Sequence, residues 1–128
     1  MRRMFLFFSH TLTREQEEDA RATLMVDEFV YLPAGLQGAW SAFDPGAGTI
    51  DGQLEALRRY VDENCGPEDV CLVHGDSGAV FSLVSHLRER GFKAYYSTTR
   101  RVFEGETMPE GTARNSHLFR HVRFREYE

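Results

Sequence analysis

The sequence predicts an α/β fold: a mainly parallel sheet flanked by helices, with a C-terminal antiparallel β-hairpin. Short apolar runs of strand length recur along the chain, and segments with the 3.6-residue periodicity of a helix separate them. The early runs are continuous, which is typical of strands covered on both faces. Strands that alternate with helices in this way favour parallel pairing and right-handed crossovers.

The strands are predicted from the apolar runs and from the residues that end them. The second run ends at Pro33, which has no N–H for a ladder hydrogen bond. In the last segment, apolar residues ending in Phe124 alternate with His121, Arg123 and Arg125, which predicts a strand with one buried face. A polar hairpin loop is expected over Gly105–Asn115, and the expected strands are Met4–Phe8, Phe29–Leu32, Val70–Val73, Ala94–Ser97, Arg101–Phe103 and His117–Arg125.

Three helices are predicted from capping residues and apolar spacing. Thr13 and Gln16 match a capping box, so the first helix begins at Thr13, ends near Leu24 and carries an acidic outer face that includes Asp19. The second helix covers Asp51–Asn64, and the third carries an apolar stripe from Ala79 to Leu87 and stops at Gly91. Residues 34–48 are expected to form a loop with one helical turn around Leu36–Trp40, in which Trp40 either packs in the core or stacks on a base.

Composition and charge limit the functions that this chain can have. A chain of 128 residues is expected to form one domain over residues 1–128. The net charge of −5 argues against broad binding to long nucleic acids, and no apolar run approaches the ~20 residues that a membrane span needs. Two cysteines are too few for a disulfide framework, and the apolar run that ends at Phe8 is too short for a signal peptide. We therefore expect a cytoplasmic protein that carries no metal or cofactor.

The positive charge is concentrated near the C-terminus. Residues 1–99 carry nine basic and fifteen acidic residues, whereas residues 100–128 carry six basic and five acidic residues. All six of those basic residues are arginine, and Lys93 is the single lysine of the chain. The planar guanidinium suits bidentate contact with phosphate, although charges on strands and loops are also commonly just solvated.

Polar residues follow three of the predicted parallel strands. They are Ser9-His10, Gly75-Asp76-Ser77-Gly78 and Ser97-Thr98-Thr99-Arg100-Arg101. In an open α/β sheet a ligand lies beyond the carboxyl ends of the strands, where the strand order reverses, and the second group also opens a helix. Hydroxyls, an imidazole, a carboxylate, two guanidiniums and a helix N-terminus together predict a site for a phosphate-bearing ligand.

Each of these elements also has a purely structural interpretation. Gly75 and Gly78 are the residues that a tight turn or a close backbone approach requires, and Asp76 or Ser77 is a good helix N-cap. The segment matches neither a Walker loop, nor the dinucleotide fingerprint, nor the nucleophile elbow of hydrolases. His74 lies between the end of the predicted strand at Val73 and the turn that starts at Gly75, and it is expected to be buried with satisfied hydrogen bonds.

The chain resembles a small protein family encoded beside type III CRISPR systems. The resemblance covers most of the chain and is carried by Phe7-Phe8-Ser9-His10 with Leu12-Thr13, by Val30–Pro33, by Val73–Ala79 and by His121–Tyr127. It implies a compact, Rossmann-like relative of the CRISPR-associated Rossmann fold (CARF) that binds cyclic oligoadenylate across a homodimer. Members of the group are thought to be ring nucleases, which linearise the messenger and end the antiviral response.

The expected chemistry follows from the substrate. An RNA ring carries its own nucleophile, the ribose 2′-hydroxyl, so that positioning and charge stabilisation suffice without a metal. We expect His10 to act as acid or base, with Ser9 and Asp76 as the other catalytic candidates. Asp76 would orient a ribose hydroxyl or His10. The expected ligand-binding residues are Gly75, Ser77, Gly78, Thr98, Thr99, Arg100 and Arg101.

Two other functions compete with ring cleavage. The first is a module that binds the messenger as a sensor or sponge without cutting it, because the sequence contains no obvious catalytic dyad. The second is an Asp-dependent or metal-dependent hydrolase that uses Asp76.

Overall fold

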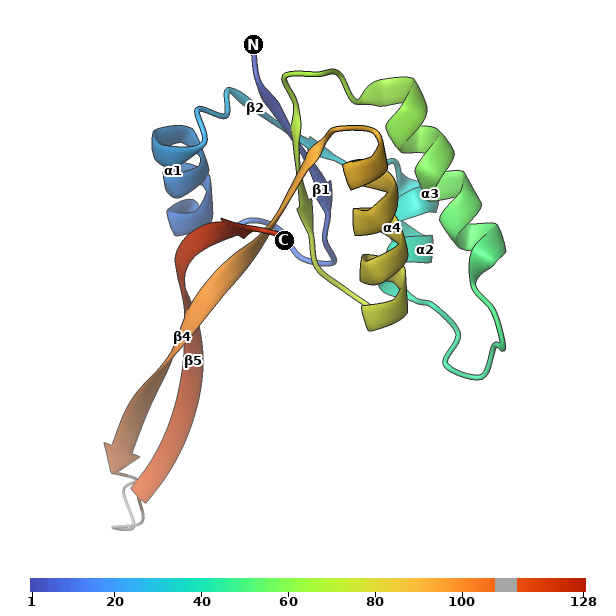
Figure 1. The fold of residues 1–128 in the computed structure, drawn as a ribbon. Helices are drawn as coiled ribbons and strands as arrows, with labels where there is room; N and C mark the ends of the chain where they lie inside the picture. The colour runs from blue at the N-terminus through green and yellow to red at the C-terminus, as the bar shows by residue number, and fades with distance from the viewer. Residues whose placement is uncertain (108–112) are drawn as a thin grey trace.

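The computed structural model describes the backbone of residues 1–107 and 113–128 and the side chains of residues 1–102 and 119–128. Strands and helices alternate along most of the chain, and two long strands end it (Figure 1). The elements are β1 (Arg3–Phe7), α1 (Arg14–Thr23), β2 (Glu28–Tyr31), α2 (Ala34–Ser41), α3 (Asp51–Asn64), β3 (Val70–Val73), α4 (Ser77–Glu89), β4 (Lys93–Thr107) and β5 (Ala113–Glu126).

The sheet has five strands in the order β2-β1-β3-β4-β5. Neighbouring strands pair in parallel from β2 to β4, and β5 pairs with β4 in antiparallel orientation. The predicted α/β class, with a mainly parallel sheet and an antiparallel C-terminal hairpin, is confirmed. The chain leaves β1 toward β2 on one side and returns to β3 on the other, so the strand order reverses between β1 and β3.

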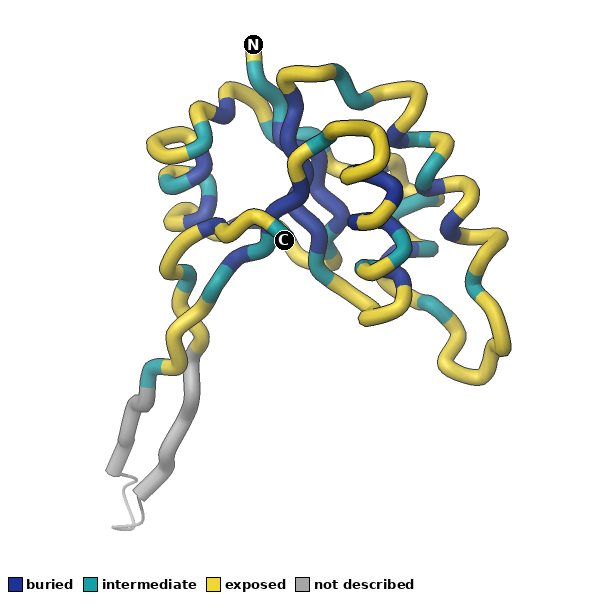
Figure 2. Tube along the Cα trace, viewed as in Figure 1, coloured by how far each residue is buried: buried dark blue, intermediate teal, exposed yellow. Residues whose placement is uncertain are grey.

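The helices cover both faces of the sheet. Alternate residues of β1 point to opposite sides: Phe5 and Phe7 pack in the cluster under α2, α3 and α4, whereas Met4 and Leu6 pack in the cluster under α1. Burial is concentrated in β1 and β3, which lie in the middle of the sheet (Figure 2). In the described part of the chain, no helix has both the length and the apolar character needed to cross a membrane.

The segment after Pro33 is more helical than the sequence indicates. α2 spans eight residues, from Ala34 to Ser41, where a loop with one helical turn was expected. Gly35 and Gly38 lower helix propensity, but Trp40 is 2% exposed, and its packing in the core outweighs that local preference. The prediction that Trp40 packs in the core is confirmed.

The C-terminal hairpin is longer than expected and is formed by β4 itself. One continuous strand, Lys93–Thr107, replaces the two predicted strands and pairs with β5 along its length. β3 accompanies it only as far as Tyr95, so that beyond this point β4 and β5 form a two-stranded ribbon that projects from the body of the molecule (Figure 1). Residues 105–107 and 113–115 belong to the strands, and the rest of the predicted loop lies outside the described residues.

A β-bulge reverses the predicted faces of part of β5. Thr98 pairs with Arg123 and Thr99 pairs with His121, so that Val122 is the extra residue. The His121 side chain consequently lies on the same face as Phe124, with the two rings 4.5 Å apart, while Val122 is 48% exposed. The prediction that Val122 and Phe124 share the buried face and that His121 lies opposite is therefore wrong.

Candidate functional site

A small cleft lies beyond the carboxyl ends of β1 and β3, where the strand order reverses. Its volume is about 200 Å³, and its lining residues are Phe8, Ser9, His10, His74 and Gly75. The strand pairing continues to the edge of the cleft, since the His74 N–H donates to the Phe7 carbonyl at 2.9 Å. This is the place at which open α/β sheets bind ligands, and it brings together Ser9, His10 and Gly75 as the sequence predicts.

Two imidazoles flank this cleft with an aromatic ring between them. The Phe8 ring lies edge-on to both, with its centroid 5.5 Å from that of His10 and 5.9 Å from that of His74. His10 is exposed and His74 is half-buried. A ligand that enters the cleft therefore meets one solvated histidine and one held in the protein.

The structure fixes which nitrogen of His74 carries a proton. Its Nε2 accepts a hydrogen bond from the Ser97 N–H at 3.0 Å, so the neutral ring carries its proton on Nδ1. Burial lowers the pKa of His74, which favours this neutral form. The predicted role of a buried, satisfied histidine is therefore only partly right, because His74 also borders the cleft. The sequence places His74 at a strand end, as it does Ser9-His10, but one residue nearer the strand, and that position predicts burial.

Gly75 is required by the close approach of Trp40. The indole Nε1–H donates to the His74 carbonyl at 2.8 Å and so ties the loop after β3 to α2. A Cβ atom added at Gly75 would lie 3.0–3.1 Å from three atoms of the indole. The buried Trp40 side chain therefore also sets the position of His74 and Gly75, which form one wall of the cleft.

Asp76 acts as the N-cap of α4. Its Oδ2 accepts a hydrogen bond from the Ala79 N–H at 3.0 Å, which is the structural alternative that the sequence left open. This carboxylate places a negative charge where a bound phosphate would otherwise sit at the helix N-terminus. Ser77 and Gly78 are the first residues of the helix, and Ser77 borders a different hollow, one lined by α4 and the C-terminus.

The capping role of Asp76 can be tested with two substitutions. We expect Asp76→Ala to lower the free energy of unfolding by about 1 kcal/mol, because the Ala79 N–H loses its acceptor. Asp76→Asn should stay close to the unsubstituted protein, since asparagine caps nearly as well. Urea denaturation of both variants measures the difference. A folded Asp76→Asn protein that binds its ligand but has lost all turnover would instead favour the Asp76-dependent hydrolase.

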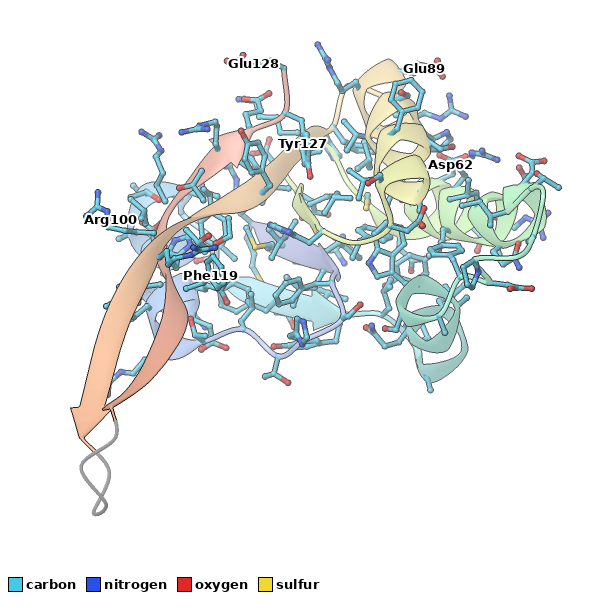
Figure 3. All side chains as sticks on the ribbon, turned by 90° about the horizontal axis from the view of Figure 1, so that it is seen from below. Asp62, Glu89, Arg100, Phe119, Tyr127 and Glu128 are labelled. Carbon is cyan, nitrogen blue, oxygen red and sulfur yellow. The ribbon has the colours of Figure 1, made fainter. Side chains whose placement is uncertain are left out.

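The residues after Ser97 are carried away from the cleft on the ribbon. The Thr98 hydroxyl bonds to the backbone N–H and carbonyl of Arg123 at 3.2 and 3.1 Å, while Thr99 and Arg100 are exposed. The Arg101 guanidinium lies over the Phe119 ring, 5.7 Å from its centroid. Figure 3 shows Arg100 on the ribbon, with Tyr127 between the ribbon and α4. The predicted site is therefore only partly formed, because Thr98, Thr99, Arg100 and Arg101 do not line the cleft.

A hydrogen-bonded chain of three polar side chains lies behind the cleft. Asp19 Oδ2 is 2.7 Å from His121 Nε2, and His121 Nδ1 is 2.5 Å from Ser97 Oγ. Sequence reasoning missed this group for two reasons: the acidic stretch of α1 was expected to face solvent, and the bulge that turns His121 inward has no local sequence signal. The Asp19 side chain is 20% exposed and that of His121 is 4% exposed, so both are directed toward the sheet.

The described residues contain no group of three or more His, Cys, Asp or Glu side chains placed to hold a metal ion. Their chemistry near the cleft consists of imidazole, hydroxyl and backbone N–H groups, which suit proton transfer and hydrogen bonding to an oxyanion.

The fold and the cleft define an α/β protein with a polar site at the switch point of a mainly parallel sheet. The chain belongs to the family described as the uncharacterized protein MJ1673 family, whose model matches residues 2–125. It is 39% identical over 127 residues to the uncharacterized protein MJ1673 of Methanocaldococcus jannaschii, and the match covers 99% of this chain and 98% of that protein. No solved structure matches the chain.

Proposed function

We propose that this protein is a cytoplasmic, homodimeric ring nuclease that binds a cyclic oligoadenylate, with cyclic tetra-adenylate as the first candidate, and linearises it without a metal. It would thereby switch off type III CRISPR signalling. One observation carries the proposal. Three of the four sequence motifs that underlie the resemblance to the CRISPR-associated family are far apart in the chain, yet two of these three supply His10 and His74 to one cleft. The third supplies His121, which is linked to His74 through Ser97.

The residues of the cleft suit 2′-hydroxyl attack. His10 takes the proton of the 2′-hydroxyl, the 2′-oxygen forms a bond to phosphorus, and the bond from phosphorus to the 5′-oxygen breaks. The 5′-oxygen takes a proton from solvent, which leaves a 2′,3′-cyclic phosphate and a free 5′-hydroxyl. The Nδ1–H of His74 donates to a non-bridging phosphate oxygen, where negative charge builds up in the transition state.

The size of the cleft favours action by two subunits. A volume of about 200 Å³ is below the 300–1,000 Å³ that a drug-sized ligand usually occupies, and a cyclic oligonucleotide is larger still. Each cleft therefore takes one phosphate with its ribose, while the rest of the ring lies across the surface. A two-fold ring matches a two-fold dimer, because each protomer presents the same cleft to an equivalent phosphate.

The cleavage reaction tests the proposal directly. Purified protein in excess is incubated with cyclic tetra-adenylate and EDTA, and the ring and its products are separated by chromatography. We expect linear products that end in a 2′,3′-cyclic phosphate. Binding without any product would support the sensor or sponge function, and a ring that is neither bound nor cut would contradict both.

The ribbon arginines are expected to contribute to binding rather than to stability. Arg100 and Arg101 are exposed and lie outside the core, so Arg100→Ala and Arg101→Ala should leave the melting temperature within about 2 °C. Each loss of a charge-assisted phosphate contact should weaken binding of cyclic tetra-adenylate by about tenfold, or roughly 1.4 kcal/mol. Calorimetric titration measures the affinity, and Arg88→Ala on α4 is the control for loss of one exposed arginine. A large fall in melting temperature for both ribbon variants would show that these residues are structural.

Mixed dimers locate the arginines relative to the two clefts. If the ribbon of one protomer serves the cleft of its partner, a mixture of Arg100→Ala and His10→Ala protomers regains turnover, since one cleft of each mixed dimer then has both residues. If each ribbon serves its own cleft, every mixed dimer retains one defect in each cleft, and turnover stays low.

A further inference from the structure

The chain of Asp19, His121 and Ser97 connects three elements at one buried point. Asp19 comes from α1, Ser97 from β4 and His121 from β5. The contacts are short, with Asp19 Oδ2 2.7 Å from His121 Nε2 and His121 Nδ1 2.5 Å from Ser97 Oγ. Gln16 Nε2 also lies 3.4 Å from Ser97 Oγ. The group therefore joins α1 to the start of the ribbon.

The hydrogen bonds are all satisfied when the His121 ring is neutral. Nε2–H donates to the Asp19 carboxylate, and Nδ1 accepts from the Ser97 hydroxyl. The Ser97 oxygen then accepts from the Gln16 amide, so that each proton of the chain has one acceptor.

The arrangement resembles that of a serine hydrolase, but Ser97 is too enclosed to act as a nucleophile. Ser97 is 7% exposed. Two hollows flank this part of β5, with volumes of about 550 and 200 Å³, and they are bordered by Asp19 and His121 respectively but not by Ser97. A substrate carbonyl or phosphorus therefore has no room beside the seryl oxygen. The backbone N–H of Ser97, in contrast, contacts His74, which lines the cleft.

That N–H determines the state of His74. The last parallel pair between β3 and β4 joins Leu72 to Tyr95, and β4 then leaves β3 for the ribbon. Just beyond this last pair, the Ser97 N–H of β4 donates a hydrogen bond to His74 Nε2 at 3.0 Å. The imidazole thus takes the place of the backbone carbonyl that would accept this hydrogen bond if the β3–β4 pairing continued. Ser97 is paired with Phe124 in the β4–β5 ladder, and its side chain bonds in addition to His121 and Gln16.

From this geometry we infer that Asp19, His121 and Ser97 are positioning residues: they hold the Ser97 N–H against His74, which lines the cleft, and thereby keep His74 as the tautomer with its proton on Nδ1. None of the three touches the ligand. The inference deepens the proposed function, because a fixed donor at Nδ1 matters catalytically only if the cleft binds a phosphate. The tautomer itself, however, is a property of the free protein.

The chain contains a matched control for this group. His86 on α4 is also buried and pairs with a carboxylate, with Nε2 2.9 Å from Asp62 Oδ1. The His86 side chain is 10% exposed, compared with 4% for His121. Asp62 bonds onward to Arg90 and not to a residue of the cleft, so loss of His86 removes a buried histidine–carboxylate pair without disturbing Ser97.

The test is nitrogen NMR of protein labelled with ¹⁵N in its histidine rings. In the unsubstituted protein we expect His74 to show the single Nδ1–H tautomer from pH 6 to 8. In His121→Ala the His74 ring should exchange between its two neutral tautomers, because the Ser97 N–H is no longer held against Nε2. His121→Gln should restore the single tautomer, since one amide supplies both a donor and an acceptor. His86→Ala should leave His74 unchanged even if it lowers stability equally.

Turnover of cyclic tetra-adenylate provides the second readout. We expect His121→Ala to lower kcat by about 10- to 100-fold, in line with the loss of other outer groups that orient a functional histidine, and His121→Gln to recover most of it. If the unsubstituted protein shows the single His74 tautomer and loses it in His121→Ala but never cuts the ring, the positioning role stands and the ring-nuclease proposal fails. If His74 in His121→Ala behaves as it does in His86→Ala, the positioning role is wrong, whatever the protein cleaves. Ser97→Ala, which retains the backbone N–H, gives an independent measurement should His121→Ala fail to fold.

Discussion

Replacing His10 with alanine is expected to slow cleavage of cyclic tetra-adenylate by about 10²–10⁴-fold, which is the usual contribution of a positioned general acid or base. Binding should change little, because in the proposed mechanism His10 acts on the proton of the 2′-hydroxyl and not on the charge of the ring. Stability should also be unaffected. His10 is exposed, and its ring contacts the Phe8 ring with the two centroids 5.5 Å apart.

Separate measurements of kcat and affinity test this prediction. Single-turnover rates are followed by chromatography, and affinity is measured by calorimetric titration with a 2′-deoxy analogue of the ring that cannot be cut. Ser9→Ala is measured beside it, since Ser9 borders the same cleft and is the other catalytic candidate there. A smaller defect in Ser9→Ala than in His10→Ala would assign the proton transfer to the imidazole. A folded His10→Ala protein that cuts at the normal rate would show that another group removes the proton. A loss of binding that accounts for the whole defect would assign His10 to ligand binding instead.

Replacing Gly75 with alanine is expected to lower both stability and turnover. The new Cβ would lie 3.0–3.1 Å from the Trp40 indole. Because Trp40 is 2% exposed in the core, the indole cannot move freely away from the new methyl group. Overpacking of this kind typically costs about 1–3 kcal/mol. The displaced segment carries His74, whose carbonyl accepts from the Trp40 Nε1–H at 2.8 Å, so the cleft wall should shift as well.

Gly78→Ala is the control for the Gly75 substitution. The added Cβ meets a single atom within 4 Å, Asp76 Oδ2 at 3.4 Å, and the position is helical. Alanine is the better helix former by up to about 1 kcal/mol, so this variant should match or exceed the stability of the unsubstituted protein. Urea denaturation compares the two variants. Equal stability of Gly75→Ala and Gly78→Ala would show that the indole yields to the new methyl group and does not set the position of the loop.

Several elements could be predicted from the sequence because their signals are local. The capping box at Thr13 begins α1 as predicted, and the apolar spacing between Asp51 and Asn64 gives α3 its observed bounds. The convergence of Ser9-His10 with Gly75 could also be predicted, because the carboxyl ends of parallel strands meet at one edge of a sheet. These inferences need only the residues of one segment or the direction of pairing.

Other features depend on packing that no single segment encodes. α2 forms in spite of two glycines because Trp40 is buried, and β4 continues as a ribbon because β5 pairs with it throughout. The bulge at Val122 turns His121 inward, where it meets Asp19. A one-residue shift in a strand exchanges its two faces, so this contact could not be foreseen from the alternation of residues.

The sequence by itself determined the α/β class, most element positions and the strand ends at which a site belongs, since periodicity and capping act over a few residues. Only the tertiary structure decided that His74 is a cleft residue, that Asp76 caps α4 and that the ribbon arginines lie away from the cleft. Each of these outcomes depends on which atoms from distant segments come within hydrogen-bond or van der Waals distance. That distance is set by strand register and core packing.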